Sequence, residues 1–149
     1  MAPSSSDSQK KYERVLALDV GTRRIGLAVS DALGITAQGL PTLTRGSRRE
    51  DLEHLEAVIK KNDVRILVVG RPVRLGGEAS AQTQKVEKFA EVLKEHFKLP
   101  IHFADERLTS WEAHQLLDQE KLSRHERKGK VDRIAACLVL QSFLDSRQK

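Results

Sequence analysis

The stretch Leu16-Ala-Leu-Asp-Val-Gly-Thr-Arg-Arg-Ile-Gly-Leu-Ala-Val-Ser-Asp31 decides the fold, because it holds two apolar segments joined by a tight polar turn. The first segment, Val15–Val20, is apolar on both faces except at Asp19, as expected of a central strand that helices cover on both sides. The turn is Gly21-Thr22-Arg23-Arg24, and Ile25–Ser30 then continues as a second strand. This pattern predicts an antiparallel hairpin with a carboxylate near the end of its first strand.

Strand-like and helix-like segments alternate along the rest of the chain. A weaker third strand is predicted at Ile35–Leu43, and the capping-box spacing of Ser47–Glu50 predicts the start of a helix. Two further strands are predicted at Ile66–Val69 and Ile101–Ala104. Helices are predicted over Ala81–Phe97 and after a second capping box at Thr109–Glu112. The last predicted element is a C-terminal helix, whose apolar face carries Val131, Ile134, Ala135, Leu138 and Val139. Three strands followed by alternating helix and strand predict an α/β sheet of mixed strand direction.

The chain length of 149 residues is that of a single domain with one core. Residues 1–11 are Ser-rich and polar, and we expect them to be a disordered tail. No internal repeat and no linker divides the remainder, so residues 12–149 are predicted to form one domain.

The net charge of +5 is concentrated near the C-terminus. Residues 1–120 contain 18 basic and 18 acidic side chains, whereas residues 121–149 contain 8 basic and 3 acidic ones. A basic patch on a balanced body indicates a polyanion partner that is reached from one side. A solvated basic face is the alternative explanation.

Several classes of protein are excluded by composition. No apolar run approaches the roughly 18–20 residues that span a membrane, and the polar N-terminus has no apolar core of a secretory signal. The single cysteine, Cys137, excludes an internal disulfide and a cysteine-based zinc cluster, and its apolar surroundings predict a buried structural thiol. A reducing cytoplasm is the expected location.

Four acidic residues interrupt or end apolar segments: Asp19 in the first strand, Asp105 and Glu106 after the strand Ile101–Ala104, and Asp132 at the start of the C-terminal helix. Ligands of open α/β sheets bind beyond the carboxyl ends of parallel strands. We therefore expect Asp19, Glu106 and Asp132 to form a catalytic cluster, with Asp105 in a structural role. Oxygen ligands without His or Cys favour Mg²⁺ or Mn²⁺, which can support phosphodiester cleavage.

Each of these acids also has a structural explanation. Asp19 can shape the hairpin turn, and Glu106 can pair with Arg107 or cap the helix that begins at Thr109. Asp132 can be a first-turn acid that the helix dipole favours. The shared placement of the three acids, rather than any one of them, carries the prediction of a cluster.

Basic residues lie close to these acids in the sequence and are predicted to bind a nucleic-acid backbone. Guanidinium groups bind phosphate oxygens in a bidentate manner, although ordinary neutralisation of the carboxylates is the alternative. The segment Leu122–Lys130 has no apolar residue after its first, which predicts a mobile basic loop. The predicted backbone-binding residues are Arg23, Arg24, Arg71, Arg74, Arg107, Arg124, Arg127, Lys128 and Lys130.

Four sequence blocks, taken in order, resemble the bacterial YqgF/RuvX family of Holliday-junction resolvases and pre-16S rRNA-processing nucleases. These blocks are Leu16–Asp31, Val68–Pro72 with Gly76 or Gly77, Asp105–Thr109 and Lys130–Ala136, and the resemblance extends from about Val15 to Leu144. One block departs from the family pattern. Arg71, Val73, Arg74 and Leu75 occupy a loop in which the family commonly has Leu-Asn-X-X-Gly after the proline, so the substrate preference of that loop is not carried over.

The resemblance implies a ribonuclease-H-like α/β fold, with a five-stranded mixed sheet and helices on both faces. It also implies that Asp19, Glu106 and Asp132 act through Mg²⁺ or Mn²⁺. The expected function is a divalent-metal-dependent endonuclease acting on structured RNA or branched DNA, in pre-16S rRNA 5′-end processing, four-way junction resolution or both. The alternative is a catalytically weak nucleic-acid-binding or ribosome-assembly factor. A junction resolvase would be a homodimer with two active sites, whereas an RNA processor needs only one.

The first block also resembles the Asp-X-Gly-Thr phosphate motif of sugar kinases and actin-like ATPases. Those proteins enclose the nucleotide between two such domains, and 149 residues supply only one. The Gly-rich segment Gly70–Gly77 lacks the Gly-Lys-Ser/Thr ending of a phosphate loop. A nuclease is therefore favoured over a nucleotide phosphotransferase.

Overall fold

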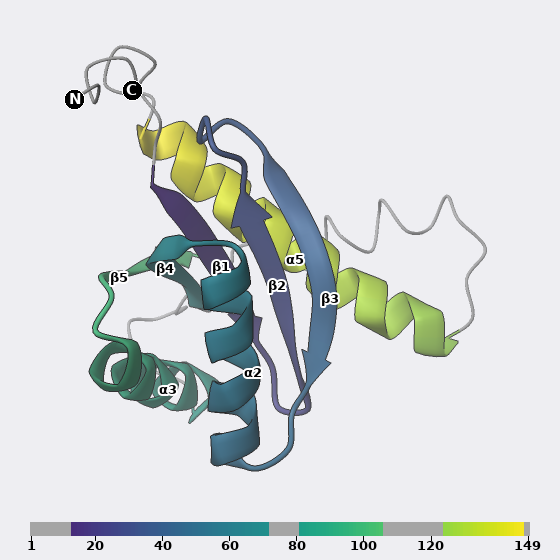
Figure 1. Cartoon of the computed structure of the whole chain (residues 1–149). Coiled ribbons are helices and arrows are strands. Elements are labelled where there is room, and N and C mark those ends of the chain that lie inside the picture. The colour runs from purple at the N-terminus through teal and green to yellow at the C-terminus, as the bar shows by residue number, and fades with distance from the viewer. Residues whose placement is uncertain (1–12, 72–80, 106–123, 148–149) are drawn as a thin grey trace.

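The computed structural model describes residues 13–71, 81–105 and 124–147. Five strands and three helices lie in this part of the chain (Figure 1). In order they are β1 (Arg14–Val20), β2 (Arg24–Ser30), β3 (Ala37–Thr44), α2 (Arg48–Lys61), β4 (Val64–Arg71), α3 (Ala81–Phe97), β5 (Ile101–Asp105) and α5 (Arg124–Arg147). The predicted tail at residues 1–11 and the predicted helix after Thr109 lie outside the described residues.

The five strands form one mixed sheet in the order β3-β2-β1-β4-β5. β1 with β2 and β2 with β3 pair antiparallel, whereas β1 with β4 and β4 with β5 pair parallel. The predicted hairpin and the mixed strand direction are therefore confirmed. Because β1, β4 and β5 run in one direction, their carboxyl ends lie at the same edge of the sheet, where Asp19 and Asp105 are found.

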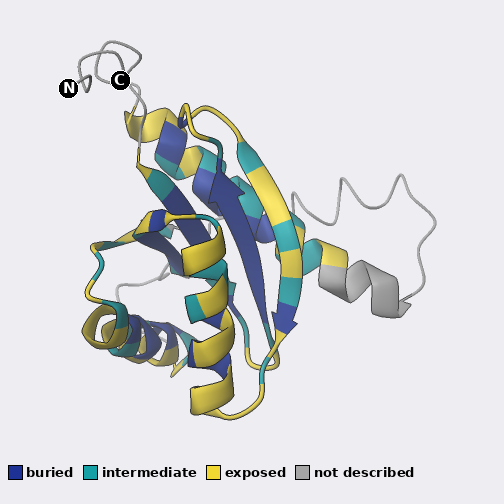
Figure 2. Ribbon diagram, viewed as in Figure 1, coloured by how far each residue is buried: buried dark blue, intermediate teal, exposed yellow. Residues whose placement is uncertain are grey.

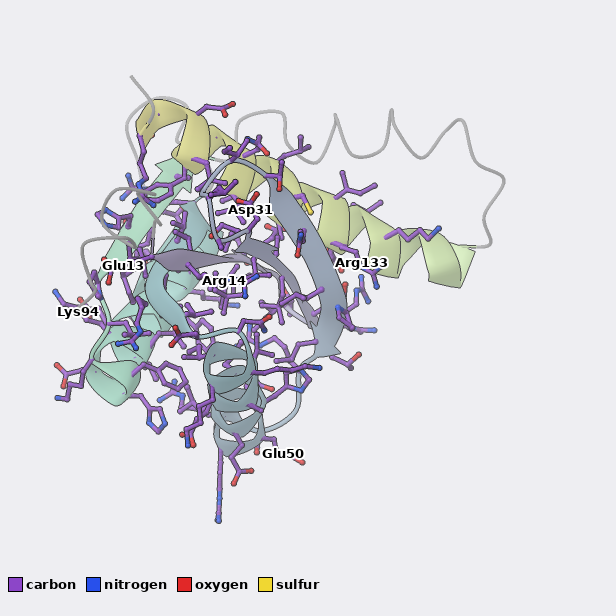
Figure 3. The ribbon with its side chains drawn as sticks, turned by 45° about the horizontal axis from the view of Figure 1, so that its top comes forward. Glu13, Arg14, Asp31, Glu50, Lys94 and Arg133 are labelled. Atoms are coloured by element: carbon purple, nitrogen blue, oxygen red, sulfur yellow. The ribbon has the colours of Figure 1, made fainter. Side chains whose placement is uncertain are left out.

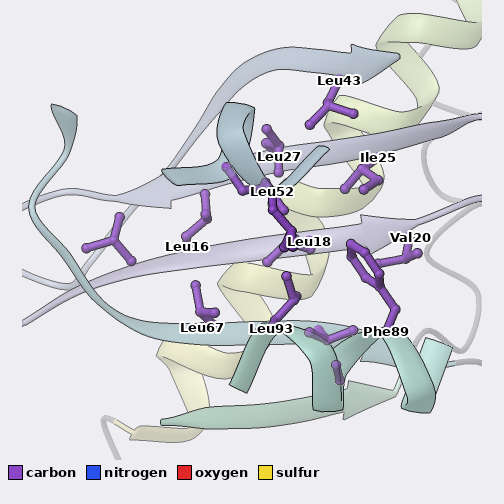
Figure 4. Close-up of a cluster of buried hydrophobic side chains, with 14 of the residues drawn as sticks. Leu16, Leu18, Val20, Ile25, Leu27, Leu43, Leu52, Leu67, Phe89 and Leu93 are labelled. Atoms are coloured by element: carbon purple, nitrogen blue, oxygen red, sulfur yellow. The ribbon is translucent and has the colours of Figure 1, made fainter. Parts of the chain in front are cut away.

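Two apolar cores lie on opposite faces of the sheet. On one face, α2 and α3 pack against alternate residues of the central strands, among them Leu16, Leu18, Ile25 and Leu27 (Figure 4). On the other face, α5 is the one described helix that covers a smaller core (Figures 1 and 2). That smaller core contains Val15, Ala17, Ala28, Val68, Ala136, Val139, Leu140 and Leu144. The predicted helices on both faces are thus confirmed.

The predicted capping box at the start of α2 is confirmed. The Ser47 hydroxyl accepts the Glu50 N–H at 3.1 Å, and the Glu50 carboxylate accepts the Ser47 N–H at 2.9 Å. The Ser47 backbone N–H, and to a lesser degree the Ser47 hydroxyl, lower the pKa of the Glu50 carboxyl group, because hydrogen bonds to the carboxylate stabilise its charged form. The two capping bonds fix the point at which the chain leaves β3 and enters the helix.

The predicted strand Ile66–Val69 extends two residues further at each end, and two other predicted boundaries are wrong. The third strand begins at Ala37 rather than Ile35, because the Asp31 carboxylate accepts the N–H groups of Ile35 and Thr36 at 2.8 and 3.3 Å and thereby holds a turn. The predicted loop Leu122–Lys130 is helical from Arg124, so α5 begins two turns earlier than its apolar pattern indicates. Arg, Lys and Glu are good helix formers, and a helix anchored in the core can extend into such a polar segment. The first turns of α5 project beyond the sheet (Figure 1).

Candidate active site

Asp19 and Asp132, which we call the acid pair, converge on one face of the sheet around Gly26. Strand alternation directs Leu18 and Val20 toward α2 and α3, so Asp19 between them faces α5. Asp19 lies directly opposite Gly26 in the β1–β2 register. The backbone of Asp132 lies over the same glycine, so α5 places the second acid on the same part of this sheet face.

Gly26 permits this close approach of α5 to the sheet. A Cβ atom at this position would lie 2.5 Å from the carbonyl carbon and 3.2 Å from the Cα of Asp132, closer than packed carbon atoms tolerate. Any larger residue would therefore displace the helix. The absence of a side chain is what allows the backbone of Asp132 to rest on β2.

Asp132 is held in place by an ion pair with Arg24, which lies two residues before Gly26 on β2. Arg24 Nε donates to Asp132 Oδ2 at 2.7 Å, and the two side chains are 33% and 22% exposed. A charge-assisted bond of this length fixes the direction of the carboxylate. Arg24, predicted to bind a nucleic-acid backbone, thus also orients an acid.

The apolar stripe of α5 explains why Asp132 faces the sheet. The predicted core positions Ile134 and Leu138 are only partly buried, whereas Ala136, Val139 and Leu140 are fully buried. Asp132 lies one turn before Ala136 and so continues this buried stripe. It is in the third turn of α5, not the first, which removes the helix-dipole explanation for its presence.

Arg71 does not join the acid pair. It ends β4 on the α3 side of the sheet, where its Nη1 lies 3.5 Å from Glu87 and its guanidinium covers the ring of Phe103 at 4.8 Å. Alternation places it with Leu67 and Val69, away from α5. The prediction that Arg71 lies beside the acids is therefore not supported by its position.

The other predicted site residues are placed only in part. Arg23 is exposed on the β1–β2 turn, and Lys130 is exposed on α5. The backbone of α5 includes three further predicted basic residues, but their side chains are not among those that the structure describes: Arg124, Arg127 and Lys128. Three predicted site residues lie outside the described ranges: Arg74, Glu106 and Arg107.

The carboxylate oxygens of the acid pair are ligands that Mg²⁺ and Mn²⁺ prefer, so the chemistry of these donors fits such an ion. Within the described ranges, no three His, Cys, Asp or Glu side chains gather in a way that could hold a metal. Glu106, the third predicted acid, follows β5 directly and lies beyond those ranges. The described residues thus supply two of the three predicted ligands.

A basic cleft beside the β1–β2 turn was not predicted from the sequence. It has a volume of about 630 Å³ and lies between the turn, the loop from β3 to α2 and the first turns of α3. Its basic lining residues are Arg23, Arg45, Arg48, Lys85 and Lys88. The signal available in the sequence was the spacing of Lys85 and Lys88, which share a helix face with a gap of three.

Cys137, predicted to be a buried structural thiol, is only half-buried. It lies on α5 near Arg133, which lies beside β3 (Figure 3). Burial raises the pKa of the Cys137 thiol, and the positive charge of Arg133 offsets this only in part. A raised pKa disfavours the thiolate, so this residue is a poor nucleophile.

A family model described as RuvX, Holliday junction resolvase, matches residues 13–146. A protein of Koribacter versatilis named "Putative pre-16S rRNA nuclease" is 54% identical over 136 residues, covering 91% of this chain and 89% of that protein. A protein of Clostridium novyi with the same name is 47% identical over 133 residues, covering 89% of this chain and 98% of its own length.

Solved structures of low sequence identity share the fold. RuvC of Thermus thermophilus in complex with a Holliday junction has a TM-score of 0.54 at 14% identity, covering 92% of this chain and 96% of that one. The fowlpox virus resolvase with its Holliday junction DNA has a TM-score of 0.54 at 11% identity, covering 91% and 99%. These likenesses confirm the ribonuclease-H-like fold. None of the described helices is long and apolar enough to cross a membrane.

Proposed function

The chain belongs to the RuvX family, and from this membership we propose that it is a divalent-metal-dependent endonuclease that cleaves structured nucleic acid. The observation that carries the proposal is the convergence of Asp19 and Asp132 on one face of the sheet around Gly26. Two carboxylates rarely share a partly buried position unless a cation or a basic group offsets their charge. Here Arg24 offsets part of it, and a divalent ion would offset the remainder.

Three acids would hold the metal in this proposal: Asp19, Asp132 and Glu106. Glu106 directly follows β5, whose carboxyl end lies at the same sheet edge as that of β1. A bound divalent ion supplies activation of water and stabilisation of the leaving oxygen. The protein supplies the carboxylates, their orientation by Arg24 and the rigid sheet that keeps them in register.

The basic residues would hold the substrate backbone beside these acids. Arg24 lies at the acid pair, and the start of α5 carries Arg124, Arg127, Lys128 and Lys130 on a helix that projects beyond the sheet. Arginine and lysine side chains bind phosphate oxygens without reading base sequence, so they would set the position of the backbone. The predicted set also includes Arg23, Arg71, Arg74 and Arg107, of which Arg74 and Arg107 follow the ends of β4 and β5 in the sequence.

Precursor 16S rRNA is the substrate that we place first. Relatives that are 43–54% identical to this chain are named "Putative pre-16S rRNA nuclease", whereas the solved resolvases that share the fold are only 11–14% identical to it. A four-way DNA junction is the second candidate, and its symmetric cleavage would require a homodimer with two active sites. Both substrates occur in the bacterial cytoplasm, the compartment that the single cysteine also favours.

The test incubates the protein with a precursor 16S rRNA fragment and, separately, with a labelled four-way junction, in Mg²⁺, in Mn²⁺ and in EDTA. We expect cleavage of the RNA only with a divalent ion. Asp19→Asn and Asp132→Asn should abolish cleavage while the protein remains folded, because the amide keeps the shape but loses the charge. Binding should be retained or slightly tighter in both variants, since one negative charge near the phosphates is gone.

The thermal stability of the protein provides an independent measurement of metal binding. An ion that binds only the folded state raises the melting temperature by mass action, and Asp19→Asn should remove that increase. An equal response to Mn²⁺ in wild type and variant would contradict the assignment of Asp19 as a ligand. Tight RNA binding without cleavage in any divalent ion would instead identify a nucleic-acid-binding or ribosome-assembly factor.

A further inference from the structure

The basic cleft lies on the opposite side of the β1–β2 turn from the acid pair. Val20 and Gly21 line it, and Val20 faces α2 and α3, whereas Asp19 faces α5. The five cations that line the cleft come from three separate segments, and no Asp or Glu is among its described lining residues. Cations that converge from several segments onto one hollow create a local positive potential that attracts an anion.

Arg45 is the fixed element of this cleft. Its Nη1 donates to the Gly21 carbonyl at 2.8 Å, and its Nε lies 3.4 Å from the Asp51 carboxylate. Its guanidinium also covers the ring of Phe89 at 4.9 Å. A guanidinium has five N–H donors, and neither of these bonds involves Nη2, so this end of the group can bind a phosphate oxygen.

The buried carboxylate of Asp51 fixes the loop that carries Arg45. Its side chain is only 3% exposed, and Oδ1 accepts the N–H of Gly46 at 2.9 Å. The backbone N–H of Arg45 donates to the carbonyl of Arg23 at 2.8 Å, which ties this loop to the β1–β2 turn. Two walls of the cleft are therefore connected before any ligand binds, and little order must be gained on binding.

The lining favours a phosphate backbone over a mononucleotide. Phe89 is the single aromatic residue of the described lining; it is 6% exposed, and Arg45 already covers its ring. No aromatic face is thus available to stack on a base. By contrast, Arg48, Lys85 and Lys88 are exposed along the cleft, so their charged groups can bind successive phosphates of an extended nucleic-acid strand.

We propose that the basic cleft is a second binding site for the phosphate backbone of the nucleic-acid substrate, remote from the bond that is cleaved. Arg23 lines the cleft, while its neighbour Arg24 bonds Asp132 on the other side of the turn. A strand that passes around this turn contacts both sites. The proposal rests on the nuclease function proposed above and adds that the substrate must extend beyond the cleavage site.

The test compares Lys85→Gln/Lys88→Gln with Lys61→Gln/Lys94→Gln, a control with the same change of charge. All four lysines are exposed, and Lys94 lies toward the end of α3 away from the cleft (Figure 3). Affinities for a labelled RNA stem-loop with a long single-stranded flank are measured in EDTA over a series of salt concentrations, which separates binding from cleavage. Circular dichroism first establishes that both variants are folded.

We expect the cleft variant to bind the RNA more weakly than the control does. Its slope of log K against log salt concentration should be shallower by about 0.7–0.9 for each lost phosphate contact. The difference should disappear on the stem-loop without its flank, because the remote phosphates are then missing. Equal affinity and equal slope for the two variants would overturn the proposal. Competition by ATP that the cleft substitutions abolish would overturn it as well, since the site would then bind a nucleotide.

The binding measurements in EDTA test the cleft proposal independently of the nuclease proposal. If the wild type shows the expected flank-dependent binding but cleaves neither RNA nor DNA in any divalent ion, the cleft proposal is supported and the nuclease proposal fails. If cleavage occurs but the cleft variant binds like its control, the nuclease proposal stands and the cleft proposal fails.

Discussion

Gly26→Ala tests whether the close contact between α5 and β2 sets the position of the acid pair. The new Cβ would lie 2.5 Å from the carbonyl carbon of Asp132, whereas packed carbon atoms lie about 3.5–4.0 Å apart. The helix must therefore move away from the sheet by about 1 Å, since the neighbouring atoms are backbone and cannot rotate aside. Asp132 would move with it, while Asp19 stays on β1.

The two consequences of this shift have different magnitudes. Overpacking of this kind costs about 1–3 kcal/mol of the free energy of unfolding, which for a chain of this size lowers the melting temperature by roughly 3–12 °C. A displacement of ~1 Å in the catalytic geometry can cost ~10²-fold in rate. We therefore expect cleavage to fall far more than the fraction of folded protein does.

The assay measures melting temperature and single-turnover cleavage of the RNA substrate on the same preparation. Ile25→Val is the matched control, because Ile25 is the neighbouring residue, is fully buried and faces α2 and α3 instead of α5. This control should lose about 0.5–1.5 kcal/mol of stability yet retain its cleavage rate. Full activity of Gly26→Ala, or losses of activity that match in the two variants, would refute the reasoning.

Three other variants address the ion pair, the start of α5 and the Asp31 turn. Arg24→Gln leaves the Asp132 carboxylate without its guanidinium, so the free energy of unfolding in urea should fall by about 1 kcal/mol; an unchanged midpoint would show that the pair adds no stability. Replacing Arg127, Lys128 and Lys130 by Gln should weaken the binding of RNA of every sequence. The slope of log K against log salt concentration should become shallower by about 0.7–0.9 per lost phosphate contact. An unaltered slope would show that the start of α5 does not contact the RNA backbone. Partial burial raises the pKa of the Asp31 carboxyl, but hydrogen bonds from backbone N–H groups outweigh this effect, so the pKa is lowered from 3.8. The stability that Asp31→Asn removes should therefore be present above pH 3.8 and should be lost as the pH falls through the lowered pKa.

The central hairpin, a first strand covered by helices on both sides and the acid on that strand were predictable, because each depends on residues close together in the sequence. The division of the core into two clusters, one on each face, was not predicted. Two apolar segments flanking Gly21–Arg24 can hardly pair in another way, and the capping box at Ser47 is a local signal. The rotation of α5 was not predictable to the same degree. Its sequence offers overlapping apolar stripes, and only the close contact at Gly26 selects the stripe that places Asp132 against the sheet.

The basic cleft was missed because its parts are distant in the sequence. Arg23, Arg45 and Lys88 lie on three separate segments of the chain. The buried Asp51 holds the loop that carries Arg45, and the bond from the Arg45 N–H to the Arg23 carbonyl ties this loop to the β1–β2 turn. The low exposure of Asp51 could not be inferred from its place on a charged helix. The distribution of charge along the chain instead predicts a basic patch near the C-terminus, where the excess of basic over acidic side chains is largest.

The position of α5 in the chain also determines when the acid pair forms during protein synthesis. Asp19 leaves the ribosome early, but Asp132 follows 113 residues later, counted as 132 minus 19. Among the described helices, α5 is the one that packs on the sheet face made by Val15, Ala17 and Ala28, so neither the second core nor the pair can form before it emerges. The acid pair therefore forms only after α5 has left the ribosome and has packed on the sheet.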